Sequence, residues 1–140
     1  MFFKKRSQGH TQKKERRSAF RVPAHDEFVV DFQTDGFVRM SGGGAGKDLS
    51  VSGICFATFA PLKKGQTIDM TLRFSPSFSG PPKIAMSAQV VRVARPRRAR
   101  RFRIACRFTD LENSAHEIEV IRHFTFWISL GENKQASQAA

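Results

Sequence analysis

A strict alternation of apolar and polar side chains along residues 66–74 is the feature that most constrains the fold. The apolar positions are Ile68, Met70, Leu72 and Phe74, and every residue between them is polar or charged. Successive side chains of a β-strand point to opposite sides. The pattern therefore predicts a strand that buries one face and exposes the other.

Comparable segments recur along the chain. They cover residues 27–32, 37–40, 53–59, 84–93 and 102–108, and turn-forming residues separate them. The alternation changes phase after Val90, which predicts a β-bulge near Val90 and Val91. In the last strand, Arg103 and Arg107 are predicted to face outward. About six short strands with one apolar face each predict a mainly β, antiparallel barrel or sandwich.

One helix is predicted to follow the strands and to cover an open end of the barrel. Ser114 and Glu117 have the spacing of a capping box. An apolar stripe follows at Ile118, Ile121, Phe124 and Ile128. Gly131 is predicted to end the helix. The chain then divides into a flexible basic arm (1–20), one folded domain (21–131) and a disordered tail (132–140).

The positive charge is concentrated in two segments. The chain has a formal net charge of +12. Residues 1–21 contain eight Lys or Arg and one Glu, and residues 92–107 contain eight Arg and no acid. Such concentration indicates an anionic partner, but it does not distinguish nucleotide phosphates, nucleic acid, lipid head groups or an acidic protein surface. For the segment 92–107, a solvated hairpin, a protein or ligand contact and nucleic-acid binding all stay open.

Several other classes of protein are disfavoured. The glycine-rich run 42–46 followed by Lys47 is not a phosphate-binding loop, because Ser41 replaces the first Gly and Asp48 the required Ser or Thr. It is interpreted as a loop between strands. The four histidines lack metal-site spacing, and no catalytic constellation is evident, so we expect no metal, no cofactor and no enzymatic activity. Cys55 and Cys106 are expected to be buried, reduced thiols, with a disulfide as the alternative.

The sequence also favours a cytoplasmic location. No segment reaches the length of a membrane-spanning helix, and residues 1–6 lack the apolar region of a signal peptide.

Two short motifs carry the functional hypothesis. The first is Arg17-x-x-x-Arg21, at the end of the basic arm. The second begins 27 residues later and reads Asp48-x-Ser50-x-x-Gly53. In this order, ahead of the strands and the final helix, they resemble the signature of the PilZ family, RxxxR followed by [D/N]xSxxG. The resemblance covers about residues 16–130.

The resemblance implies a six-stranded antiparallel β-barrel with a C-terminal helix and a site for the bacterial second messenger cyclic di-GMP. The ligand-binding residues that it implies are Arg16, Arg17, Arg21, Asp48, Ser50 and Gly53. Their chemistry suits this ligand. A guanidinium group binds phosphate oxygens or the guanine O6 and N7 in a bidentate way, and a carboxylate accepts from guanine N1–H and N2–H₂. The glycine allows close approach of the backbone.

In the family, an Arg at the position of Arg16 is associated with binding a stacked pair of ligand molecules. Whether Arg16 binds ligand or is a solvated arm residue stays open. The glycine-rich approach to Asp48 departs from the family pattern, and it leaves the placement of Asp48 open.

The sequence therefore predicts a receptor whose basic arm becomes ordered when cyclic di-GMP binds and which then signals to a downstream protein of unknown identity. Two alternatives remain. One is a PilZ-like adaptor that binds a protein without nucleotide. The other is a basic β-barrel that binds nucleic acid, which is disfavoured because no exposed aromatic residues suited to base stacking are evident.

Overall fold

The structure is a computed structural model that describes residues 22–24, 26–35 and 40–139. Its strands are β1 (Val22–Pro23), β2 (Phe28–Thr34), β3 (Ser41–Leu49), β4 (Gly53–Thr58), β5 (Thr67–Phe74), β6 (Lys83–Ala94) and β7 (Phe102–Thr109). A 3₁₀ turn, η1 (Leu111–Asn113), leads into the helix α2 (Ala115–Ala139).

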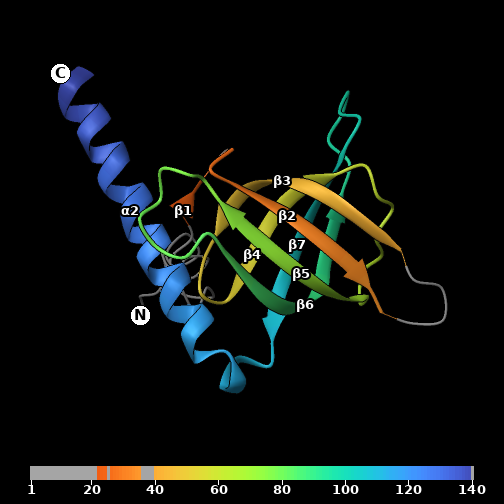
Figure 1. Ribbon diagram of the computed structural model, residues 1–140. Coiled ribbons are helices and arrows are strands. Elements are labelled where there is room, and N and C mark those ends of the chain that lie inside the picture. Colours follow the sequence, from red (N-terminus) through yellow and green to blue (C-terminus); the bar gives the residue numbers. More distant parts are fainter. Residues whose placement is uncertain (1–21, 25, 36–39, 140) are drawn as a thin grey trace, which may run out of the picture.

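Strands β2 to β7 form a closed antiparallel barrel (Figure 1). Neighbours are hydrogen-bonded in the order β3-β2-β5-β6-β7-β4, and pairing of β4 with β3 closes the ring. The two-residue strand β1 adds to the free end of β3. The predicted six-stranded antiparallel barrel with a C-terminal helix is confirmed.

Alternating side chains fill the barrel, as the sequence predicts. In β5, Ile68, Met70, Leu72 and Phe74 are buried, while Thr67, Asp69 and Arg73 are exposed. The predicted bulge is present as well, because the register of β6 against β7 shifts between Val90 and Arg92. A bulge increases the local twist of its strand. In Figure 1 the hairpin between β6 and β7 extends past the other strands.

The glycine-rich segment was predicted to be a loop, and that prediction is wrong. Residues 41–49 form strand β3, which pairs with both β2 and β4. The reason is packing. A Cβ at Gly46 would lie 2.5 Å from the ring of Phe28, and one at Gly42 would lie 2.8 Å from the ring of Phe32. The glycines provide the space in which these rings pack inside the barrel.

Helix α2 covers one end of the barrel through an aromatic cluster. Phe124 packs against Phe28, Phe74 and Phe78, with ring centroids 5.9, 4.6 and 5.2 Å away. Trp127 lies on the same side, 5.7 Å from Phe124. Such contacts bury the apolar stripe of the helix and close the core.

The predicted start of the helix after Ser114 is confirmed, but the predicted end at Gly131 is wrong. The helix runs to Ala139, through the residues expected to form a disordered tail. A glycine inside a helix costs only about 1 kcal/mol, and Lys, Gln and Ala beyond Gly131 are good helix formers. A Cβ at Gly131 would meet no atom within 4 Å, so nothing else requires glycine there.

Both cysteines are buried thiols outside any disulfide, as predicted. Burial, with a smaller contribution from the neighbouring Cys55, raises the pKa of the Cys106 thiol to about 12. Cys106 therefore stays protonated and unreactive near neutral pH.

Candidate functional site

The motif Asp48-x-Ser50-x-x-Gly53 forms the corner between β3 and β4. Its three defining residues lie at the end of β3, in the turn and at the first residue of β4. A β-bulge precedes them, because the register shifts between Gly46 and Asp48, leaving Lys47 as the extra residue.

This bulge decides which way Asp48 faces. Gly46 pairs with the core residue Phe56, and Leu49 pairs with the core residue Ile54. Asp48 pairs with Cys55, whose neighbours in β4 are those two core residues, so both face the outside of the barrel. Without the extra residue, the alternation from Gly46 would direct Asp48 into the apolar core. The uncertain placement of Asp48 is thus resolved in favour of an outward carboxylate.

Strand β1 pairs with the end of β3 at the second motif. Val22 pairs with Leu49, and Pro23 pairs with Asp48. The next residue is anchored too, because the Ala24 N–H donates to the Lys47 carbonyl at 2.9 Å. Arg21 directly precedes Val22 in the sequence. The first described residue after Arg21 therefore lies beside the second motif.

Ser50 holds the corner in shape. Its hydroxyl oxygen accepts hydrogen bonds from the N–H groups of Ser52 and Gly53, both at 3.2 Å. Its own N–H donates to the Gly53 carbonyl at 2.9 Å, and the residue is only 1% exposed. The motif serine thus stabilises the turn that presents Asp48, a structural task that the sequence interpretation did not assign to it.

Gly53 begins β4 and pairs with Arg107 of β7. Sequence reasoning had recognised Arg107 only as an outward residue of a basic strand. Its position beside the motif depends on the register of β4 against β7, which no local pattern reveals.

Arg16, Arg17 and Arg21 lie outside the described residues, as does the basic arm as a whole. The structure therefore brings together Asp48, Ser50 and Gly53, and it pairs the first described residues, Val22 and Pro23, with the strand that carries Asp48.

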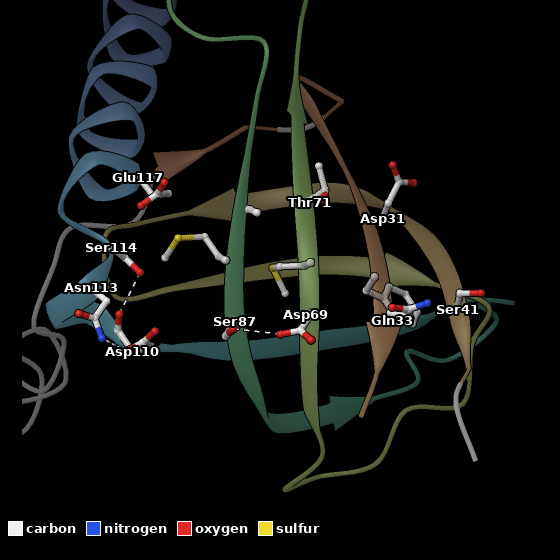
Figure 2. Close-up of a pocket in the computed structure, with 14 residues that line it drawn as sticks. Asp31, Gln33, Ser41, Asp69, Thr71, Ser87, Asp110, Asn113, Ser114 and Glu117 are labelled. Atoms are coloured by element: carbon white, nitrogen blue, oxygen red, sulfur yellow. Dashed lines mark hydrogen bonds between the residues drawn. The ribbon is translucent and has the colours of Figure 1, made fainter. Parts of the chain in front are cut away.

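A surface groove of about 580 Å³ lies elsewhere on the barrel (Figure 2). It runs over β2, β5 and β6 to the start of α2, and no motif residue lines it. Its ionisable side chains are all acidic: Asp31, Asp69, Asp110 and Glu117. Asp69 accepts a hydrogen bond from the Ser87 hydroxyl, and Asp31 forms an ion pair with Arg73. A groove with this charge does not suit a phosphate-bearing ligand.

Within the described residues, no group of His, Cys, Asp and Glu side chains could hold a metal ion. No helix there is both long and apolar enough to span a membrane.

Several solved structures share the fold of this barrel. The chain superposes on YcgR from Escherichia coli in complex with c-di-GMP with a TM-score of 0.71 and 18% identity, covering 89% of this chain and 51% of that one. For the isolated PilZ domain of YcgR from Escherichia coli with c-di-GMP, the TM-score is 0.64 at 18% identity, with 87% and 98% covered. For the inhibitor of motility MotI/DgrA from Bacillus subtilis, the TM-score is 0.61 at 18% identity, with 83% and 52% covered.

The chain thus spans about half the length of YcgR and MotI, and these likenesses concern the fold. No curated protein matches the sequence. The family model of the PilZ domain matches residues 15–127, which include both motifs and every strand of the barrel. On this match, the chain belongs to the PilZ domain family.

Proposed function

We propose that this chain is a receptor for cyclic di-GMP whose site lies where β1 meets the corner between β3 and β4. The observation that carries the proposal is the pairing of Val22 and Pro23 with Leu49 and Asp48. It supports a site in which Arg17 and Arg21 converge on the outward carboxylate of Asp48. Family membership supports the same ligand, and two of the similar structures are described as holding c-di-GMP.

The roles of the residues follow from their chemistry. Arg17 and Arg21 bind phosphate oxygens or a guanine edge, while Asp48 accepts hydrogen bonds from guanine N1–H and N2–H₂. Ser50 and Gly53 keep the corner open to the ligand, and Ser50 does so through its bonds to the turn. Arg16 supplies a further cation for a stacked pair of ligand molecules, whose four phosphodiester charges need more cationic partners than one molecule does.

The test is a calorimetric titration with cyclic di-GMP, competed by GTP and by single-stranded DNA. Arg21→Ala is expected to lower the affinity by about 10- to 100-fold, since about 1.4 kcal/mol corresponds to a factor of ten. Arg122→Ala is the matched control, because the Arg122 side chain is exposed on α2 and its ion pair among the described residues is with Glu119. Unchanged affinity in Arg21→Ala would contradict the site. Competition by single-stranded DNA would favour the nucleic-acid alternative, and absence of any nucleotide binding would favour the adaptor.

We propose further that the ligand orders residues 8–22 across the barrel and so changes the surface offered to a downstream protein. The physical reason is charge, because residues 1–21 carry eight Lys or Arg and only one acid. A ligand phosphate offsets their mutual repulsion. Hydrogen exchange of residues 8–22 is expected to slow when cyclic di-GMP is added. Equal exchange with and without ligand would contradict the ordering, even if binding itself is tight.

A further inference from the structure

The outer face of strands β4 and β7 beside Asp48 differs from an ordinary solvated sheet. Three of its residues, Cys55, Ala57 and Ala105, are buried, at 4, 7 and 5% exposure. None of the three belongs to the barrel core, whereas their neighbours Ile54, Phe56, Ile104 and Cys106 do. By the alternation of a strand, the three small residues therefore lie on the outer face.

Arginines surround these small residues. Arg103 pairs with Ala57, and Arg107 pairs with Gly53 across the β4–β7 ladder. Arg92 of β6 pairs with Ala105. All three arginines are exposed. Cys55 pairs with Ala105 of β7, and Arg103 and Arg107 lie two residues before and after Ala105 in that strand.

Asp48 lies in the same row of the sheet. It pairs with Cys55, which in turn pairs with Ala105. With strands about 4.8 Å apart, β7 lies about 10 Å from the backbone of Asp48. The extended side chains of Arg103 and Arg107 can therefore approach a ligand that is held at the Asp48 carboxylate.

Among the described residues, Arg92, Arg103 and Arg107 of this face form no ion pair. Within the described residues, the ion pairs are Arg73–Asp31 and Arg122–Glu119, and neither involves this face. Arg107 donates to the neutral Gln89 side chain at 2.8 Å. An anion bound between such exposed arginines forms charge-assisted hydrogen bonds with their guanidinium groups.

We infer that Arg103 and Arg107 are additional phosphate-binding residues of the cyclic dinucleotide site, which extends from Asp48 across β4 to β7. The inference rests on the proposed function and deepens it. Ala57, Cys55 and Ala105 have small side chains, so no bulky side chain of β4 or β7 stands between the two arginines. The guanidinium groups then reach the ligand phosphates from β7.

The experiment compares Arg103→Gln and Arg107→Gln with Arg97→Gln and Arg100→Gln at the hairpin tip, all titrated with cyclic di-GMP at one ionic strength. Each β7 variant is expected to lose about 10-fold in affinity, the effect of one charge-assisted hydrogen bond, whereas each tip variant stays within about twofold of wild type. All four remove one charge from an exposed residue, so they share any effect of net charge. Gln89→Ala removes the partner of Arg107 and is expected to leave the affinity unchanged.

Two outcomes would overturn the inference. If the wild type binds cyclic di-GMP and both β7 variants bind within twofold of it, the arginines do not contact the ligand. If the β7 and tip variants lose affinity equally, the arginines act only through the overall positive electrostatic potential of the hairpin. A wild type that fails to bind cyclic di-GMP is a different result, because it refutes the proposed function itself. Thermal unfolding of each variant checks that the barrel is intact.

Discussion

Gly46→Ala is expected to lower the free energy of unfolding by about 3 kcal/mol, the upper part of the range for overpacked cores. The added Cβ would lie 2.5 Å from two atoms of the Phe28 ring. That ring cannot simply turn away, because Phe124 packs edge-on against it with centroids 5.9 Å apart. Either the strand or the ring must shift, and both belong to the closed part of the barrel. Chemical denaturation measures the effect.

Gly43→Ala is the matched control, because it makes the same change in the same strand. A Cβ there meets its nearest atoms at 3.5 and 3.6 Å, an ordinary contact distance. We expect a change within about 0.5 kcal/mol, as for most surface substitutions. Combining Gly46→Ala with Phe28→Leu should cost less than the sum of the two single changes, because the smaller side chain relieves the clash. Equal stability of Gly46→Ala and Gly43→Ala would contradict the packing explanation.

Asp48→Ala is expected to weaken cyclic di-GMP binding by at least about 30-fold if the proposed function is correct. The change removes the acceptor for two guanine donors, and donors left without partners in a bound complex cost about 1–3 kcal/mol each. The fold should survive, because Asp48 faces outward and its backbone pairing with Cys55 does not need the carboxylate. Calorimetry gives the affinity, and thermal unfolding verifies the fold.

Asp69→Ala separates this effect from a general change of charge. Asp69 is an exposed carboxylate on β5 and lies in the acidic groove, whose lining includes no motif residue. Its removal should leave cyclic di-GMP binding unchanged. Full affinity in Asp48→Ala would instead favour the nucleic-acid alternative, which has no need of this carboxylate.

Local patterns predicted most of the barrel. The alternation at residues 66–74 and the change of phase after Val90 each follow from neighbouring residues, and both are confirmed. Strand β3 could not be predicted in this way, because glycine has low strand propensity. Glycine is needed in this strand because the rings of Phe28 and Phe32 pack where a Cβ would lie. Those contacts join residues that are distant in sequence. The helix beyond Gly131 was missed because one glycine was given more weight than the helix formers that follow it.

In the candidate site, too, local sequence patterns predicted some features and missed those that depend on strand pairing. The order of the two motifs predicted that they meet, and the pairing of β1 with β3 supports that meeting. The sequence did not predict the bulge at Lys47 or the nearness of Arg107 to Gly53, because both depend on the register between strands. A Ser in a turn commonly bonds to the backbone, and the burial of Ser50 identifies that role here.

The separation of charge around the barrel has a kinetic consequence. Acidic side chains line the groove over β2 and β5, while β7 and its hairpin with β6 are basic. An approaching anion is therefore repelled from one side of the molecule and drawn to the other, so that more encounters occur in a productive orientation. Added salt shortens the range of this attraction and slows association more than it hastens release. The speed of response, and not only its strength, is thereby linked to the ionic strength around the protein.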